Sequence, residues 1–155
     1  TSTYGEYIFK FYNINPATDG ANLTFQVNAT DGADYNDSAI TSTYFVAFHY
    51  EDASNPTLEY TAGADQAQGT AFQSLAIDVG NAADESAAGE LHLFNPSSTT
   101  YVKHFYGITS EVGTSPYAQQ NFSAGYINDT TAIDDIRFKM SSGDFDGTIK
   151  MWGVK

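Results

Sequence analysis

Residues 40–50, ITSTYFVAFHY, decide the fold class of this protein. From residue 44 on, every second position of this stretch carries an apolar or aromatic side chain, namely Tyr44, Val46, Phe48 and Tyr50. A period of two residues places successive side chains on opposite faces of an extended chain. The stretch is also rich in β-branched and aromatic residues, which pack well on a pleated surface. We therefore predict a long, half-buried strand over residues 40–50.

The same alternation recurs in short segments separated by Gly, Asn, Asp and Ser. The strands that it predicts lie near residues 6–14, 22–29, 40–50, 58–61, 71–79, 90–95, 100–109, 122–127, 132–140 and 148–154. Strands of this length and spacing are typical of a sandwich or barrel. The sequence therefore predicts an all-β fold, an antiparallel two-sheet sandwich that is jelly-roll-like in size, as a single domain over residues 1–155. We expect the first two strands to be neighbours and residues 110–120 to form a loop.

The alternate apolar positions of the clearest strands predict the core. They are Phe9, Phe11, Leu23, Phe25, Val27, Leu91, Leu93, Ile136, Phe138 and Ile149. A chain of 155 residues buries enough surface for an independent core of this kind.

Charge and composition exclude several classes of partner. Nineteen Asp and Glu residues against six Lys and Arg residues give a formal net charge of -13. Such a chain repels phosphate backbones and anionic lipid, so we expect neither nucleic-acid nor membrane partners. There is no cysteine, and no apolar run approaches the roughly 20 residues of a membrane span.

The sequence carries no recognisable catalytic motif. It has no Gly-x-Ser-x-Gly elbow and no phosphate-binding loop that ends in Lys and Ser or Thr. The histidines, His49, His92 and His104, lie on predicted strands without metal-ligand spacing. Glu90, on a predicted strand, is the most enzyme-like of the acids, but no second acid is marked out as its partner. We therefore predict that the protein is not an enzyme.

One acidic loop is a candidate cation site. Asp31, Asp34, Asn36 and Asp37 place four hard oxygen ligands within seven residues, and Gly32 permits a sharp turn. Calcium is the cofactor that such a loop would suit, and we expect no other cofactor. The alternative is a turn whose Asp and Asn side chains cap their own backbone, and the sequence does not match the EF-hand pattern.

Two further features allow two interpretations each. Asn-x-Ser/Thr sequons begin at Asn22, Asn28, Asn36, Asn121 and Asn128. They would mark glycans in a secreted eukaryotic protein, but they also arise by composition in a chain rich in Asn, Ser and Thr. Trp152, the single tryptophan, either packs at an edge, which we favour, or offers an exposed ring to a sugar.

Five segments together resemble a known family. They are residues 13–20 (NINPATDG), 40–45 (ITSTYF), 89–96 (GELHLFNP), 132–143 (AIDDIRFKMSSG) and 147–154 (GTIKMWGV). The chain resembles, over nearly its whole length, the β-sandwich domain at the C-terminus of structural proteins of marine tailed bacteriophages. These proteins are fibre-like or capsid-decorating components of the virion. The resemblance lies in strand and turn signatures, so it implies a fold and a context but no site residues.

The resemblance implies a non-enzymatic virion surface protein, either a head fibre, a capsid decoration or a tail-fibre tip, that serves assembly or host-surface attachment. It would be made in the host cytoplasm and would bind other virion proteins and itself, as a homotrimer. From the residues, we expect the first strand, with Tyr4, Tyr7, Ile8 and Tyr12, to contribute to a subunit contact. The alternative is a carbohydrate-binding, lectin-like module for a host-surface glycan, and a sandwich-scaffold glycoside hydrolase or lyase comes third.

Overall fold

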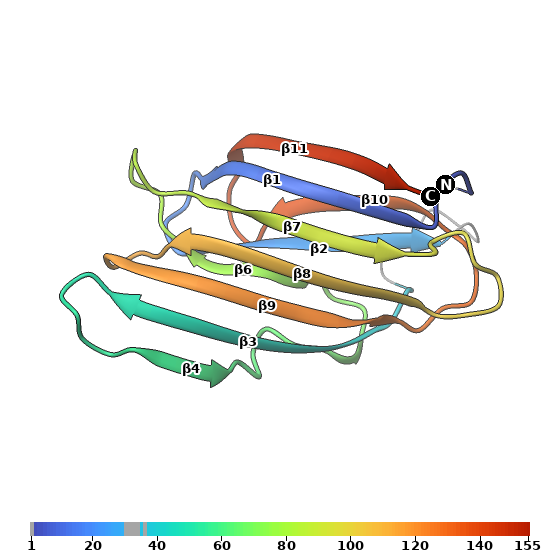
Figure 1. Cartoon of the computed structure of the whole chain (residues 1–155), viewed down its shortest axis with the longest axis horizontal. Coiled ribbons are helices and arrows are strands. Elements are labelled where there is room, and N and C mark those ends of the chain that lie inside the picture. Colours follow the sequence, from blue (N-terminus) through green and yellow to red (C-terminus); the bar gives the residue numbers. More distant parts are fainter. Residues whose placement is uncertain (1, 30–34, 36) are drawn as a thin grey trace.

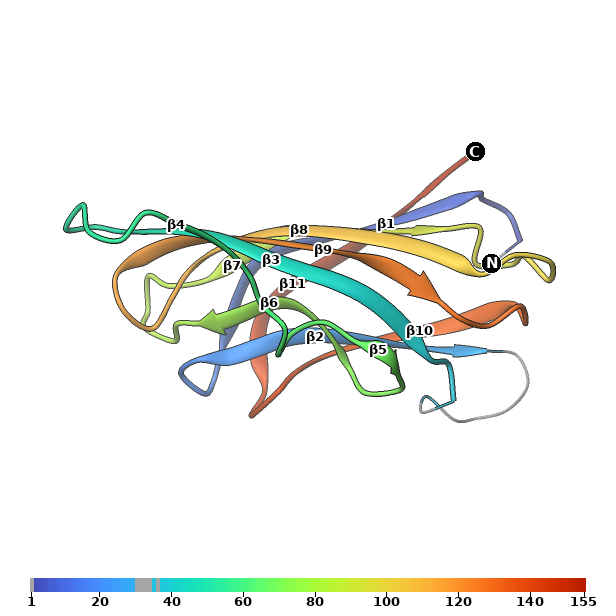
Figure 2. The ribbon, with the colours of Figure 1, turned by 90° about the horizontal axis from the view of Figure 1, so that it is seen from below.

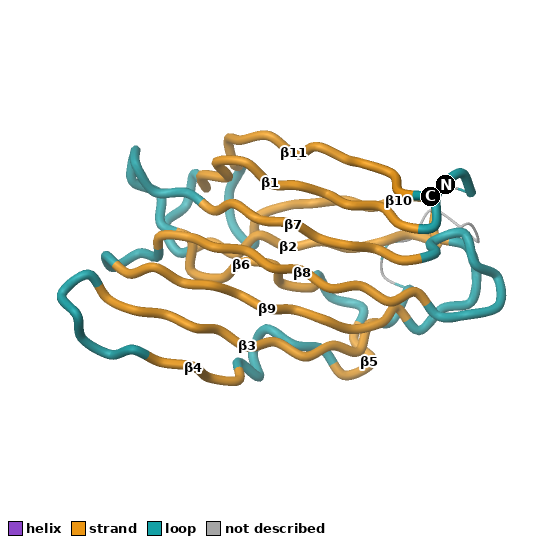
Figure 3. Tube along the Cα trace, viewed as in Figure 1, coloured by secondary structure: helices purple, strands orange, loops and turns teal. Residues whose placement is uncertain are grey.

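The computed structural model describes residues 2–29, 35 and 37–155, and this part of the chain consists of strands, turns and loops without a helix (Figure 3). The all-β prediction is confirmed. The strands are β1 (Glu6–Pro16), β2 (Ala21–Ala29), β3 (Ile40–Tyr50), β4 (Thr57–Tyr60), β5 (Ala67–Gly69), β6 (Gln73–Val79), β7 (Ala87–Phe94), β8 (Lys103–Val112), β9 (Tyr117–Ile127), β10 (Ile133–Met140) and β11 (Phe145–Val154).

Most of the strands form one wide antiparallel sheet (Figure 1). Its order is β11-β1-β7-β8-β9-β3-β4, and the short β5 pairs with the first residues of β3 on the side that β4 occupies. The first and last strands of the chain are neighbours, with Glu6 opposite Val154 and Pro16 opposite Phe145. The start of β1 and the end of β11 therefore lie side by side in the large sheet.

A second antiparallel sheet, in the order β10-β2-β6, covers one face of the large sheet (Figure 2). The predicted two-sheet antiparallel sandwich is confirmed, whereas a jelly-roll connectivity stays a prediction. No described segment lies over the opposite face of the large sheet. The sandwich is therefore unequal, with one sheet open to solvent along its whole width.

Two predictions about the strands are wrong. β1 and β2 belong to different sheets, because each has an apolar face and the turn between them lets those faces meet across the core. Residues 110–120 are not one loop, since β8 continues to Val112 and β9 begins at Tyr117. The polar residues Glu111 and Gln119 hide these strand ends from a search for apolar alternation.

The predicted core residues lie between the two sheets. Seven of the ten are at most 6% exposed, namely Phe9, Phe11, Leu23, Phe25, Val27, Leu91 and Leu93. Ile136, Phe138 and Ile149 are half-buried and pack against this core, because they come from the edge strands β10 and β11. The ring of Phe138 lies 5.3 Å from the rings of both Phe9 and Phe11, so β10 closes the core against β1.

One basic side chain also lies inside the sandwich. Lys103, at the start of β8, is fully buried, and its ammonium donates to the carbonyl oxygens of Asp129 (2.9 Å) and Thr131. Burial lowers the pKa of Lys103 from its ordinary value. The side chain thereby ties the segment between β9 and β10 to the large sheet.

Candidate functional site

The uncovered face of the large sheet is the candidate functional site, and we call it the outer face. Because successive side chains of a strand point to opposite faces, the residues on the outer face are those whose sequence neighbours point into the core. Across the sheet these residues align in register. One row comprises Trp152, Ile8, His92, Tyr106, Ala124 and Thr43. The next row comprises Lys150, Lys10, Glu90, Ile108, Phe122, Phe45 and Tyr60.

Two flanking rows complete the outer face. One contains Val154, Glu6, Phe94, His104, Tyr126 and Thr41. The other contains Thr148, Tyr12, Ala88, Ser110, Gln120, Ala47 and Leu58. Apolar and aromatic side chains make up at least half of each row, although the face is open to solvent. A solvated sheet face ordinarily carries polar residues at these positions, so this composition sets the outer face apart.

Aromatic rings on neighbouring strands stack against each other across the outer face. Phe45 and Phe122 have ring centroids 4.6 Å apart and planes within 9° of parallel. His92 and Tyr106 stack at 4.4 Å and 14°. Two of these four rings remain open to solvent, since Tyr106 is 37% exposed and Phe45 39%, whereas His92 is 8% exposed. The side chains thus hold one another in place while they leave apolar surface uncovered.

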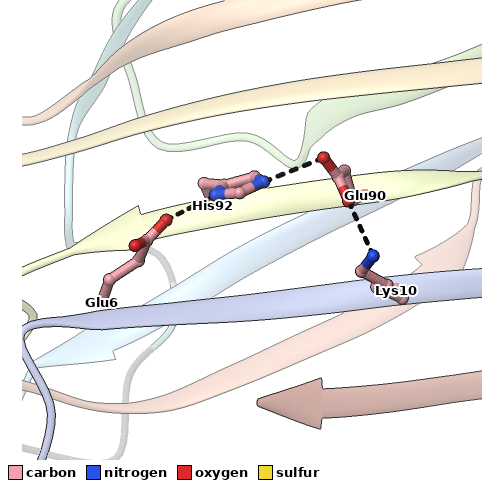
Figure 4. A network of polar contacts seen from close by, with 4 residues as sticks. All are labelled: Glu6, Lys10, Glu90 and His92. Atoms are coloured by element: carbon pink, nitrogen blue, oxygen red, sulfur yellow. Dashed lines mark hydrogen bonds and ion pairs between the residues drawn. The ribbon is translucent and has the colours of Figure 1, made fainter. Parts of the chain in front are cut away.

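Glu6, Lys10 and Glu90 of the four rows form one connected network with His92 (Figure 4). His92 Nδ1 lies 2.5 Å from Glu6 Oε1, and His92 Nε2 lies 3.1 Å from Glu90 Oε1. Lys10 Nζ is 3.3 Å from the second oxygen of Glu90 and 5.9 Å from the ring centroid of Trp152. The network links β1 to β7 on the surface and engages both ring nitrogens of His92.

This network fixes the state of Glu90, the acid that the sequence singled out as most enzyme-like. The hydrogen bond from His92 lowers the pKa of Glu90, and Lys10 lowers it further. Glu90 is therefore held as a carboxylate, which suits an ion pair and opposes proton donation. Among the described residues, no three His, Cys, Asp or Glu side chains are arranged to hold a metal ion.

Shallow hollows lie between the aromatic rows. One, of about 170 Å³, is bounded on its sides by Phe45, Tyr106, Ile108 and Phe122. A second, of about 390 Å³, lies between Lys10, Tyr12, Glu90 and Ile108. A third, of about 570 Å³, lies beside β4 next to Leu58. The outer face is thus a rough apolar surface and not a deep cleft.

The predicted cation site falls mainly outside the described residues. Asp31, Asp34 and Asn36 are not among them. Asp37 is described: it is exposed, and its Oδ1 accepts a long hydrogen bond of 3.4 Å from Ser38. The calcium site therefore stays a prediction.

The structure also places the other residues that the sequence singled out. We predicted that the Trp152 ring packs at an edge. Trp152 does lie on the edge strand β11, but its side chain is 42% exposed. Of the expected contact residues on the first strand, Tyr7 is buried in the core, whereas Tyr12 is 41% exposed on the outer face. Among the sequons, Asn121 is fully buried and Asn28 is 4% exposed, so neither can carry a glycan in the folded chain.

The sequence did not identify a buried acid, Glu111 of β8, which is 4% exposed between the sheets. Its carboxylate accepts hydrogen bonds from Gln119 Nε2 (2.7 Å) and Asn121 Nδ2 (2.8 Å). Burial outweighs these bonds and raises the pKa of Glu111 to about 8. The signal was present, because the alternation of residues 103–109, continued by two positions, places Glu111 on the same inward face as Phe105.

The group around Glu111 replaces a missing neighbour of β6, which is an edge strand of the small sheet. The carbonyl oxygen of Leu75 accepts from Thr109 Oγ1 (2.8 Å) and from the Tyr44 hydroxyl (3.4 Å). The carbonyl oxygen of Ile77 accepts from Gln119 Nε2 (3.1 Å). Side chains of the large sheet thus satisfy the backbone of a buried sheet edge. We assign this group to the stability of the fold and the outer face to function.

Comparison with known protein families, curated proteins and solved structures found no match to this chain. The described part of the chain also has no helix with the length and apolar character needed to cross a membrane.

Proposed function

We propose that this protein is a non-enzymatic surface protein of a tailed-phage particle, in a head fibre, a capsid decoration or a fibre tip, and that it attaches through the outer face. The sequence resemblance supports the virion context. The observation that carries the attachment role is the outer face itself, with Phe45, Tyr60, Tyr106 and Trp152 each 37–55% exposed on one side of one sheet. Monomeric proteins seldom expose a contiguous apolar patch larger than a few hundred Å² unless it has a function.

The polar network in this face supports attachment rather than catalysis. Glu90 is held as a carboxylate by His92 and Lys10, so it is unsuited to act as a proton donor. Paired charges within an apolar face favour specificity and register in a docked complex.

A second candidate is the carbohydrate-binding module. Its support is the Trp152 ring, 42% exposed beside Lys10, because sugar rings stack on exposed aromatic faces while charged groups bind their hydroxyls. Two lysine contacts argue against this candidate, because they cover ring faces that a sugar would need. Lys10 lies over the Trp152 ring, and Lys150 Nζ lies 5.2 Å from the ring centroid of Tyr12. A glycan array separates the candidates, since one specific hit that is lost in Trp152→Ala supports the module.

The virion proposal is tested on particles. Antibodies raised against the 155-residue chain should decorate the surface of intact phage particles in electron micrographs of the producing culture, at regular positions. Pre-absorption of the antibodies with the purified chain serves as the control and should abolish the labelling. Labelling that is confined to soluble protein outside the particles would contradict a virion role.

A further inference from the structure

We infer that the outer face binds a second copy of this chain. The inference rests on the proposed function in using the same face for attachment, and it adds the identity of the occupant. Three observations carry it: the charge of the face, its dimensions and the orientation of its rings.

The outer face is neutral within a strongly acidic chain. Its four rows contain two glutamates, Glu6 and Glu90, and two lysines, Lys10 and Lys150, whereas the whole chain has a net charge of -13. Two copies repel each other over most of their surfaces, but facing outer faces bring no net charge together. Because Lys10 and Glu90 are adjacent, a two-fold arrangement lets each lysine meet the glutamate of the facing copy.

The dimensions of the face approach those of a stable interface. Seven strands about 4.8 Å apart and four rows about 7 Å apart span about 29 Å by 20 Å, or roughly 600 Å² before the side chains at the rim are added. A standard interface buries about 800 Å² on each partner. One further copy therefore suffices to cover the apolar rows.

The rings present edges rather than faces to an incoming partner. The Phe45 and Phe122 rings are parallel and 4.6 Å apart, which is the spacing of the strands that carry them. Their planes therefore stand upright on the sheet. Such rings leave narrow hollows, like the one of about 170 Å³ beside Tyr106, that accept apolar side chains. Protein side chains fit this relief, whereas a sugar ring needs a flat aromatic face.

The first experiment needs no substitution. Sedimentation of the purified chain should give a monomer mass at about 0.01 M salt and a larger mass at about 1 M salt, where the Debye length is about 3 Å and repulsion is screened. Trp152 is the single tryptophan and lies on the outer face, so its emission should shift to shorter wavelength over the same salt range. The mass should be that of two copies, because two outer faces that pack directly cover each other, and a mass of three copies would contradict this arrangement.

Variants then locate the contact. Phe45→Lys places a charge among the stacked rings of β3 and β9 and should weaken association about tenfold or more. Leu58→Lys is a second probe that does not endanger folding, because Leu58 is 72% exposed on β4. Tyr101→Lys is the matched control, since Tyr101 is 74% exposed outside the four rows and takes the same change of charge. The control should associate like the parent chain.

Each outcome bears on the inference. Association that both outer-face variants weaken and the control does not, together with the shift in Trp152 emission, supports it. A monomer at high salt, or association to which Phe45→Lys and Leu58→Lys make no difference, overturns it. Particle labelling is read independently, so a monomeric chain on labelled particles refutes only the self-contact, and an oligomer without labelled particles refutes only the virion role.

Discussion

The two halves of the sandwich interior differ in how they are filled. Between β1 and β7 on one side and β2 and β10 on the other, the interior is apolar and includes Phe9, Leu23 and Phe25. Below β8, β9 and β3 it contains Glu111 and Asn121, both nearly inaccessible to solvent. The small sheet covers the first half with paired strands, whereas in the second half it ends at β6. Where a sheet edge turns into the interior, polar side chains must replace the missing strand.

The largest effect is expected in the apolar half. Phe25 is fully buried, and its ring lies 5.2 Å from that of Phe105. Phe25→Ala should lower the free energy of unfolding by about 3–5 kcal/mol, through lost burial and the cavity left behind. Urea denaturation measures the loss, with Phe45→Ala on the half-exposed outer face as the control, which should lose much less. Equal losses would remove the distinction between core and outer face.

In the polar half, the contribution of Glu111 to the free energy of unfolding should depend on pH. The pKa of Glu111 is about 8 in the folded chain and near 4.5 when the chain is unfolded, so the folded state holds the proton more tightly. Its contribution to stability is full below about pH 4.5 and is lost as the pH rises towards 8. Glu111→Gln removes the ionisable group, so its stability cannot change through this proton, although its amide nitrogen can no longer accept one of the two hydrogen bonds.

The unfolding free energy of the variant relative to the parent chain should therefore rise by on the order of 2–4 kcal/mol between pH 4.5 and pH 8. Denaturation of both proteins across this pH range measures the difference. Parallel curves for the two proteins would show that Glu111 is ionised in the folded chain.

A smaller effect is expected from the hydroxyl that joins the two sheets. Tyr44 donates to Asn121 Oδ1 (2.7 Å) and lies 3.4 Å from the carbonyl oxygen of Leu75. Tyr44→Phe should cost about 1–2 kcal/mol in unfolding free energy, because both acceptors keep another donor. Burial raises the pKa of Tyr44, so this loss should be constant from pH 5 to about 9. A loss that varies with pH would tie Tyr44 to the ionisation of Glu111.

The smallest effect is expected on the outer face. Lys10 and Glu90 form a half-exposed ion pair, so Lys10→Met should change the unfolding free energy by less than about 1 kcal/mol. Contacts lower the pKa of Glu90, so their stabilisation is present above the ordinary pKa of glutamate and is lost as the pH falls below it. The difference from the parent chain should accordingly vanish in acid and at high salt. A loss of several kcal/mol would mean that the pair is far less solvated than its exposure indicates.

The strands and the apolar core could be predicted because both depend on local order. Alternation over residues 40–50 predicts β3 with its observed bounds, and Phe25 was assigned to the core from its neighbours alone. Sequence reasoning failed where the period continued with polar residues, as at Glu111 and Gln119. A search for apolar alternation treats such residues as loop, although their backbone pairs in register.

The candidate site was predicted only in its parts. Trp152 and Tyr12 were recognised as possible contact residues, yet nothing local joins them to Phe45 or Tyr106. Those residues come from β11, β1, β3 and β8, and their meeting depends on the order of strands in the sheet. The acidic loop, by contrast, was prominent in sequence, but Asp31, Asp34 and Asn36 lie outside the described residues.

By itself, the sequence determined that this chain forms strands and which side chains share a face, because a two-residue period is a local property of the extended backbone. Only the tertiary structure decided which of the two faces is covered. The small sheet lies over Phe105 and Glu111 and leaves Tyr106 in solvent, although all three belong to one strand. Coverage depends on segments far away in the chain, here β2, β6 and β10, and no pattern within a strand encodes what packs against it.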